Sequence, residues 1–443
     1  YSVLSNNKTI KSGKVSLDIA PQASKEFTVP VNGLKSQPGT EYFVNFSVTT
    51  VEPEPLIPAG YEIAYDQFQL PIQAEKRIYK ANGPALTTAT SGDELTVSSS
   101  KVNFVFNKKS GLVTSYKVDG TEYFKDGFGI QPNFWRAPND NDYGNGAPKR
   151  LQVWKQSSKN FHVTDVKMTT ENKVVSLKAT YLLAAGNLYV VTYRIYPSGI
   201  VNVSAQFTST DMQAAETEVS EATRMATFTP GSDAARKAAS KLEVPRIGVR
   251  FRLPAQMNNV QYFGRGPEEN YIDRNHGTLV GVYKTTADKM YFNYVRPQEN
   301  GHHTDTRWIA LSPDKGNGLA IVADSLIGFN ALRNSIEDFD SEEALPHPYQ
   351  WNNFSPEEVA NHDEKAARNV LRRMHHVNDI TPRDFVEVCV DMKQQGVGGY
   401  DSWGARPEPF HQIPANRDYS WGFTLVPVRS ASQANEVAKY DYQ

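Results

Sequence analysis

Hydrophobic and polar residues alternate along most of this chain, which is the period of β-strands rather than of helices. Within each alternating run the apolar positions are mostly β-branched or aromatic, and the run ends at turn-forming residues. Such runs cover residues 41–51, 101–120, 173–183, 246–254, 306–313, 317–324, 384–393 and 420–428. The pattern predicts an all-β protein built from antiparallel strands.

The clearest hairpin lies in residues 188–207, where two alternating runs flank Pro197, Ser198 and Gly199. Proline presets one backbone angle of a turn, and glycine accepts the positive φ that a tight turn demands. We therefore expect two paired strands joined at this tripeptide.

Helix signals are few. Ser355, Pro356 and Glu358 resemble a capping box that opens a helix of about two turns. Residues 232–242 are compatible with a short helix or with a polar insertion. Strands do not alternate regularly with helices, which argues against a doubly wound sheet or a (β/α)₈ barrel.

The 443 residues exceed what one ordinary core accommodates, so more than one domain is expected. Residues 73–93 lack clear periodicity and carry Pro, Gly, Ser and Thr, which is typical of linkers. Residues 1–72 are expected to form a small sandwich that lacks its first strands. Residues 94–430 are expected to form a large antiparallel structure of two packed sheets, and residues 431–443 a polar tail.

Charge and cysteine content narrow the function classes. The formal net charge is −2 and the basic residues are dispersed, so no nucleic-acid partner is expected. The apolar run at 318–329 is too short for a membrane span and contains an aspartate, so no membrane partner is expected. The single cysteine, Cys389, excludes an intrachain disulfide and reads as a buried strand thiol.

The segment "FWRAPNDNDYGNG" at 134–146 is unlike strand sequence. Four Asn and Asp residues in succession, 139–142, follow Arg136 and precede Gly144. Such side chains hydrogen-bond to nearby backbone and hold irregular turns, so one interpretation is a turn fixed by Arg136. The other is a loop that lines a polar ligand site and hinges at Gly144.

A second polar segment, "YFGRGPEENYIDR" at 262–274, contains the adjacent pair Glu268 and Glu269. Adjacent side chains on an extended chain point to opposite faces, so these two cannot flank one scissile bond. A salt bridge with Arg265 or Arg274 is the favoured interpretation.

A third segment, "YVRPQENGHHTDTRW" at 294–308, contains His302, His303 and Asp305. The two histidines diverge in any extended conformation, so we interpret the segment as a polar loop leading to a strand and not as a metal site. The pair at 375–376 receives the same interpretation.

The last segment, "GVGGYDSWG" at 396–404, places Trp403 on a glycine-rich stretch. A tryptophan here is either packed inward as a plug or displayed as a platform for the apolar face of a sugar. Composition alone leaves both interpretations open.

These motifs together resemble family-2 β-galactosidases. "RAPNDND", "GRGPEENYIDR", "QENG" and "GGYDSWG" occur in this order in the C-terminal part of that family, and "SGKVSLDIAPQ" is similar to its preceding immunoglobulin-like domain. The resemblance covers essentially the whole chain. It implies a partial immunoglobulin-like β-sandwich followed by a super-sandwich similar to galactose mutarotase.

The resemblance also implies a retaining glycosidase whose two catalytic glutamates and Mg²⁺ lie in a (β/α)₈ barrel upstream. On this basis the chain reads as a C-terminal fragment that carries no catalytic residue and binds no cofactor or metal itself. Its expected partners are a β-galactoside or oligosaccharide, the enzyme's own N-terminal and barrel domains, and further copies in a homo-oligomer.

The family implies substrate contact for Trp403, and it places the loop residues Asp140, Asn141, Asp142 and Gly144 at the border of the same site. The stretch "NGAPKR" after Gly144 departs from the pattern expected of relatives, which puts a gating role in doubt. Two alternatives are a mutarotase-like enzyme that uses an internal Glu and His, and a structural or oligomer-forming module in which Trp403 is buried.

Overall fold

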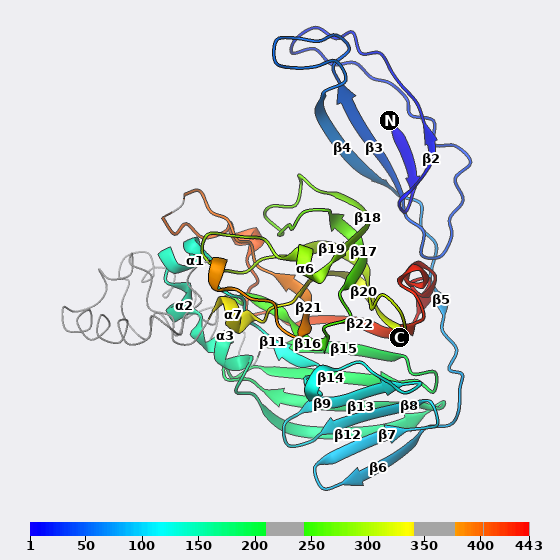
Figure 1. The fold of residues 1–443 in the computed structure, drawn as a ribbon, viewed down its shortest axis with the longest axis vertical. Coiled ribbons are helices and arrows are strands. Elements are labelled where there is room, and N and C mark those ends of the chain that lie inside the picture. Colours follow the sequence, from blue (N-terminus) through cyan, green and yellow to red (C-terminus); the bar gives the residue numbers. More distant parts are fainter. Residues whose placement is uncertain (210–242, 341–376, 402, 443) are drawn as a thin grey trace, which may run out of the picture.

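The structure is a computed structural model that describes residues 1–209, 243–340, 377–401 and 403–442. Its described strands form three antiparallel sheets of different size and one short parallel pair. Figure 1 shows the smallest of the three sheets standing apart at one end of the molecule, with the other two stacked beneath it. The prediction of an all-β, antiparallel protein is confirmed.

The first sheet lies in the predicted small sandwich. Its order is β2–β1–β3–β4, formed by Lys8–Ser12, Ser2–Ser5, Tyr42–Thr49 and Glu62–Leu70. Three phenylalanine rings pack in a row on this sheet. The ring centroid of Phe46 lies 6.1 Å from that of Phe27 and 5.9 Å from that of Phe68. Phe68 is nevertheless 54% exposed, so one face of the sheet remains open.

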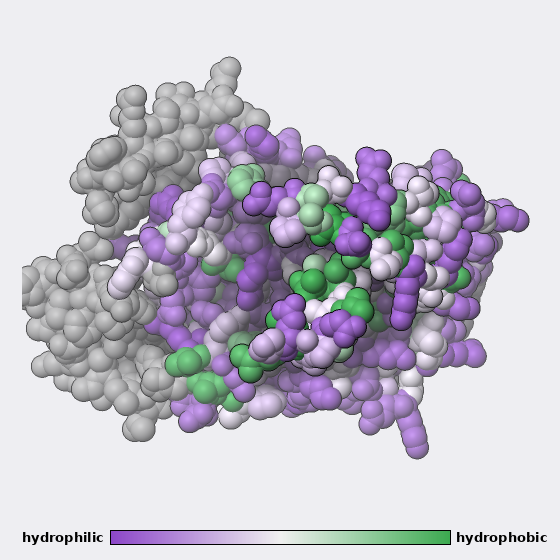
Figure 2. All heavy atoms as spheres, turned by 90° about the horizontal axis from the view of Figure 1, so that it is seen from above, coloured by the Kyte–Doolittle hydropathy of each residue, from purple (hydrophilic) through white to green (hydrophobic). Residues whose placement is uncertain are grey.

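Seen from that end of the molecule, hydrophobic side chains gather among hydrophilic ones (Figure 2). Exposed apolar residues occur on both faces of β4, with Ile63 and Tyr65 on one face and Phe68 on the other. A sheet normally buries one face against a second layer. Within the described residues, this sheet is covered in part by the segment between β2 and β3 and in part by the large sheet, where Phe43 packs against Phe263 at 6.4 Å between ring centroids.

The largest sheet contains 12 of the described strands. Nine follow one path in the order β11, β16, β21, β20, β22, β15, β14, β13, β12, with bounds Gln131–Asn133, Arg246–Pro254, Phe385–Gln394, Gly318–Leu332, Tyr419–Val428, Val201–Thr208, Leu188–Ile195, Val174–Leu182 and His162–Glu171. Strand β17 (Asn259–Gly266) pairs with β18 (Leu279–Thr286) and β19 (His303–Ser312), and β19 joins β20. The result is one large curled antiparallel sheet.

The third sheet packs against the largest one. Its order is β10–β9–β8–β7–β6, formed by Thr121–Glu122, Leu112–Val118, Val102–Asn107, Glu94–Ser98 and Thr87–Ser91. Phe104 of β8 meets Tyr193 of β14 at 5.7 Å between ring centroids, and Tyr116 Oη donates to the carbonyl of Gly199 at 2.6 Å. These contacts lie within one continuous hydrophobic core.

The predicted hairpin is confirmed. β14 and β15 pair from Leu188–Thr208 to Ile195–Val201, and the Gly199 amide donates to the Tyr196 carbonyl at 2.9 Å. Gly199 has φ +94°, the conformation for which glycine was expected. Cys389 is likewise a buried thiol on β21, and burial raises its pKa well above the usual value.

Short helices gather at one side of the large sheet, where α1 (Asp140–Gly144), α2 (Ala147–Arg150) and α3 (Gln152–Ser157) follow one another (Figure 1). The remaining described α-helices are α6 (Ala287–Met290), α7 (Ile336–Phe339) and α9 (Ala434–Val437). The helices considered at 355–358 and 232–242 lie outside the described residues.

Two domain boundaries differ from those expected. The range taken as a linker, 73–93, contains β5 (Arg77–Ile78) and all of β6. The range taken as a polar tail, 431–443, contains α9 and β23 (Tyr440–Asp441), and β23 pairs in parallel with β5. Ala434 and Tyr442 are buried at 0% and 3% exposure, because the small and aromatic residues among the polar ones face the body.

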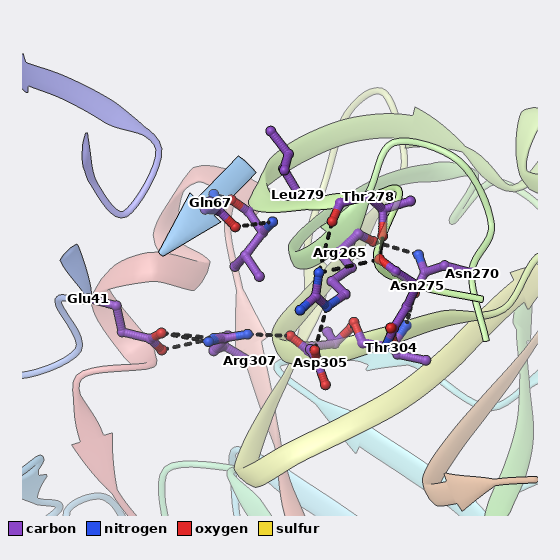
Figure 3. Close-up of polar contacts among 12 residues, drawn as sticks. Glu41, Gln67, Arg265, Asn270, Asn275, Thr278, Leu279, Thr304, Asp305 and Arg307 are labelled. Atoms are coloured by element: carbon purple, nitrogen blue, oxygen red, sulfur yellow. Dashed lines mark hydrogen bonds and ion pairs between the residues drawn. The ribbon is translucent and has the colours of Figure 1, made fainter. Parts of the chain in front are cut away.

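The first domain is joined to the large sheet by directed polar contacts (Figure 3). Glu41 accepts three hydrogen bonds from Arg307, two from Nε at 2.9 and 3.1 Å and one from Nη2 at 2.6 Å. The side-chain amide of Gln67 donates to the Val280 carbonyl at 2.9 Å and accepts from the Val280 amide at 2.8 Å. The amide group of Gln67 therefore pairs with β18 as a neighbouring strand would.

Candidate functional site

The candidate site begins at α1, which starts where the Asn and Asp residues begin. Asn139 is its N-cap: the Asp142 amide donates to Asn139 Oδ1 at 2.8 Å, and the Asn139 amide donates back to Asp142 Oδ2 at 3.2 Å. This reciprocal pair is a capping box built from an asparagine and an aspartate. The sequence "PNDND" thus becomes the start of a helix of one and a half turns and not an open loop.

Asp142 is fixed by Arg136 from the preceding segment. Both carboxylate oxygens lie 3.1 Å from Arg136 Nη2, and both side chains are buried. A buried ion pair needs further hydrogen bonds to offset desolvation. Asp142 obtains one from the Asn139 amide, so its carboxylate is committed to the turn.

Arg136 also reaches the segment that leads to Trp403. Its Nη1 donates to the Gln395 carbonyl at 2.7 Å, and its Nη2 to the Gly396 carbonyl at 3.0 Å. Asn139 Nδ2 donates to the Val397 carbonyl at 2.8 Å. Two side chains of the "RAPNDND" motif therefore hold three successive carbonyls at the start of the glycine-rich loop.

The far end of that loop returns to α1. A Cβ built on Gly144 would stand 2.6 Å from the carbonyl oxygen of Trp403, a distance that real Cβ atoms do not tolerate. Only a glycine at this position allows the two backbones to touch. Gly144 and Trp403, more than 250 residues apart in the chain, are thereby brought together, and Figure 1 shows the two segments side by side.

Asp401 fixes the turn that carries Trp403. Its Oδ1 accepts hydrogen bonds from the amides of Trp403 and Ala405, at 2.8 and 3.2 Å. This is the Asx-type turn that short acidic side chains form. Trp403 is 77% exposed, which excludes the interpretation as a buried plug.

The predicted site residues thus divide into two groups. Trp403 and Gly144 meet directly, and Asp140 lies exposed at the first position of the same helix. Asn141 is half-buried on α1, whereas Asp142 is buried beneath it. The first group can border a ligand; Asp142 acts through the turn it stabilises.

The "GRGPEENYIDR" motif lies on the other side of the loop. Glu269 receives Nη2 of Arg274 at 2.7 Å, one of the two pairings expected for this segment. Arg265 pairs instead with Asp305, at 2.5 Å. Asp273 accepts the amides of Val397 and Gly398, at 3.1 and 2.7 Å. Sequence reasoning did not identify this role of Asp273.

A buried polar cluster, also missed from sequence, lies behind the site. Arg246 is fully buried and contacts Glu299 at 2.9 Å and Asp391 at 3.1 Å, while His302 Nδ1 lies 3.8 Å from Asp391. Burial raises the pKa of Asp391 to about 7, against the opposing effect of Arg246. Burial, aided by Arg246, lowers the pKa of His302 well below its usual value.

The two histidines of the third segment are buried, at 1% and 3% exposure, and are not part of a polar loop. His303 opens β19, and its ring packs against Tyr262 and Phe329. A signal was present: His302 and His303 lie shortly before the alternating run at 306–313, and β19 begins at His303. Neither these histidines nor Glu299, 5% exposed, is accessible to a sugar as a mutarotase-like site would require.

No group of three His, Cys, Asp or Glu side chains in the described ranges could hold a metal ion. Among the helices that the structure describes, none is long and apolar enough to cross a membrane.

Known families match both parts of the chain. Residues 98–425 match the family described as "Beta galactosidase small chain", and residues 1–71 match "Beta-galactosidase, domain 4". The first match covers well over half of the chain.

Individual relatives agree with these matches. A β-galactosidase of Priestia megaterium is 31% identical over 97% of this chain, and one of Streptococcus thermophilus is 24% identical over 96%. The chain spans only 36% and 35% of the lengths of these relatives. Among solved structures, a putative mutarotase from Salmonella typhimurium aligns with 80% of this chain and 97% of its own, at 9% identity and a TM-score of 0.35.

The match over residues 98–425 includes both the capped helix α1 and the loop that carries Trp403. The chain therefore belongs to the β-galactosidase small chain family.

Proposed function

We propose that this chain is part of a β-galactosidase that hydrolyses terminal β-D-galactosyl bonds with retention, and that Trp403 borders the galactoside. The observation that carries the proposal is the exposure of Trp403, 77%, on a loop whose backbone is anchored at both ends. An indole combines a large flat apolar face with a polar N–H, which suits it to contact a ligand that is apolar on one side and polar on the other. Family membership makes a galactoside the ligand that fits.

In this proposal the chain supplies shape and contact, and the catalytic carboxylates and Mg²⁺ belong to the barrel of the enzyme. The indole presents a flat apolar face to the C–H face of the sugar. Asp140 and Asn141, on the helix that contacts the loop, offer polar atoms to hydroxyl groups. Holding the sugar in one orientation raises the rate of the chemical step at the carboxylates.

Substitution of Trp403 in the full-length enzyme tests the proposal. Trp403→Ala should lower kcat/KM for a β-galactoside about 10- to 100-fold, in line with the ~1–3 kcal/mol that an aromatic platform contributes to stacking. Trp403→Phe should retain most of the activity, because the apolar face persists. An unchanged kcat/KM in Trp403→Ala would contradict the proposal.

Phe410→Ala is the matched control, because Phe410 is 71% exposed on the segment that follows the same loop. It removes an exposed aromatic ring of similar size without touching the α1 contact. The 443-residue chain alone should not hydrolyse the substrate, since the carboxylates that we propose for the reaction lie on the barrel.

The two alternative functions receive no support from a particular observation. The structural module required a buried Trp403, and the ring is exposed. The mutarotase-like enzyme required an accessible Glu and His, and Glu299, His302 and His303 are all buried.

A further inference from the structure

We propose that Asp273 is a positioning residue, whose carboxylate sets the path of the 396–404 loop and thereby the place of the Trp403 ring. This inference rests on the proposed function of Trp403. It assigns a purpose in the site to a motif, "GRGPEENYIDR", that sequence reasoning had treated as structural.

The first observation is the contact itself. Oδ1 of Asp273 accepts the Val397 amide at 3.1 Å, and Oδ2 accepts the Gly398 amide at 2.7 Å. Two consecutive amides converge on one carboxylate, as in backbone sites that bind anions. Hydrogen bonds to an ionised acceptor are shorter and stronger than neutral ones. The loop is therefore held from the side opposite to Arg136.

The second observation is the lack of space around the carboxylate. A Cβ on Gly396 would lie 2.5 Å from Asp273 Oδ2, and one on Gly398 would lie 3.2 Å from the same atom. Glycine at these two positions lets the backbone approach the carboxylate closely. The glycines of "GVGG" and the aspartate of "YIDR" thus form one complementary contact.

The third observation is that the residues on either side of Asp273 are held by contacts of their own. Tyr271 and Arg274 bracket it in a β-bridge, with the Arg274 amide donating to the Tyr271 carbonyl at 2.7 Å. Tyr271 is buried and stacks on His302 at 5.4 Å between ring centroids. Arg274 is held by Glu269 at 2.7 Å.

Together these contacts hold residues 395–398 from two sides. Arg136 and Asn139 bind the carbonyls of residues 395–397, and Asp273 binds the amides of residues 397 and 398. The backbone between them has no freedom to rotate without breaking a charge-assisted bond. Five residues farther along the chain stands Trp403, so a small rotation at 397–398 becomes a displacement of its ring.

The test compares Asp273→Asn with Trp403→Ala, singly and together, in the full-length enzyme. Asparagine keeps one carbonyl acceptor but offers an NH₂ group to the second amide. One of the two hydrogen bonds to the loop is therefore lost, with little change in side-chain volume. We expect kcat/KM to fall about 10- to 100-fold in Asp273→Asn, the loss that a displacement of roughly 1 Å causes. In the Trp403→Ala background the same substitution should change kcat/KM less than about threefold, since coupled residues are not additive.

A second readout concerns the 443-residue chain by itself. The chain is labelled with 5-fluorotryptophan, and the ¹⁹F resonance of Trp403 is assigned by its absence in Trp403→Phe. Asp273→Asn should shift or broaden this resonance and leave the other resonances in place. Asp126→Asn is the control, because Asp126 is an exposed acid distant from the loop in sequence, at a positive φ that asparagine also accepts.

The outcomes separate the two proposals. If Trp403→Ala leaves kcat/KM unchanged, the proposed function fails whatever Asp273 does. If Trp403→Ala is impaired but Asp273→Asn is fully active, or is impaired equally in both backgrounds, the positioning role is overturned. An unchanged ¹⁹F resonance of Trp403 in Asp273→Asn also overturns it.

Discussion

Gly144 and Gly404 lie so close that a Cβ on Gly144 would stand 2.7 Å from the Gly404 Cα. One belongs to the last position of α1 and the other to the turn after Trp403. Their contact transmits the position of the capped helix to the exposed indole.

Gly144→Ala should displace the Trp403 loop. The added methyl group overlaps the Trp403 carbonyl and Gly404, and overpacking of this kind costs about 1–3 kcal/mol when it cannot relax. Because the loop is exposed, it should move rather than unfold. We expect a shifted ¹⁹F resonance of 5-fluorotryptophan at Trp403. Gly277→Ala, where the nearest atom lies 3.8 Å from the new Cβ, should leave that resonance in place.

Arg136→Lys should loosen the start of the same loop. Lysine retains the charge but cannot reach Asp142 and the carbonyls of Gln395 and Gly396 together, since it lacks the planar fork of arginine. Breaking a buried pair outright costs about 3–5 kcal/mol, so the retained charge should leave a smaller loss. Hydrogen exchange of peptides spanning 395–404 should quicken. Arg429→Lys, at an exposed position, serves as the control, and equal exchange in both variants would contradict the prediction.

Gln67→Glu should weaken the junction between the first domain and β18. The carboxylate still accepts the Val280 amide, but it faces the Val280 carbonyl where the amide group had donated at 2.9 Å. An acceptor set against an acceptor loses the bond and adds repulsion, at a cost of about 1–3 kcal/mol. Faster hydrogen exchange in the peptide 279–286 should report it. Gln22→Glu, exposed in the same domain, should not change that exchange.

Asp391→Asn should alter how stability depends on pH. The pKa of Asp391 is raised to about 7 by burial, above the unfolded value of about 3.9. Between these two values the folded chain holds a proton that the unfolded chain has lost, so rising pH favours unfolding in that window. Asparagine removes this contribution. The thermal midpoint of the variant relative to the parent should therefore increase from pH 4 to pH 7 and then level off.

The pKa values of other groups in the buried cluster are also shifted, so the comparison is a difference between variant and parent. Burial raises the pKa of Glu299, which makes stability fall with rising pH, and lowers the pKa of His302, which makes stability rise with rising pH. Both remain in the variant, and Arg246 keeps Glu299 as its partner. A difference in midpoint that stays constant with pH would contradict the raised pKa of Asp391.

The fold was largely predictable because the signal is local. Alternating runs of β-branched and aromatic residues predicted most of the strands of the large sheet. Pro197 and Gly199 predicted a hairpin, because the residues that form its turn are adjacent in the sequence. The expected linker and polar tail contain short strands that the sequence pattern did not reveal, and one pair of these strands depends on a distant partner. β23 is two residues long and exists because β5, more than 360 residues earlier, offers an edge.

The candidate site was predictable in part, from family resemblance and from local sequence. Family resemblance singled out Trp403, and the interpretation of Arg136 as the residue that fixes the Asx-rich turn agrees with the Arg136–Asp142 pair. Asp273 was missed because its partners are backbone amides, which no side-chain pattern reveals. The buried ion pairs of Arg246 join three separate segments, and a sequence does not show which charges will meet inside a core.

The parallel pair of β5 and β23 has a consequence for the topology of the chain. The Arg77 amide donates to the Lys439 carbonyl at 2.9 Å, the Tyr79 amide donates to the Asp441 carbonyl at 2.8 Å, and Tyr79 packs against Tyr442 at 5.0 Å between ring centroids. Everything between Tyr79 and Lys439 is thus a loop whose two ends are fastened to each other. Deleting the last few residues would remove β23 and leave the two ends of this loop unjoined.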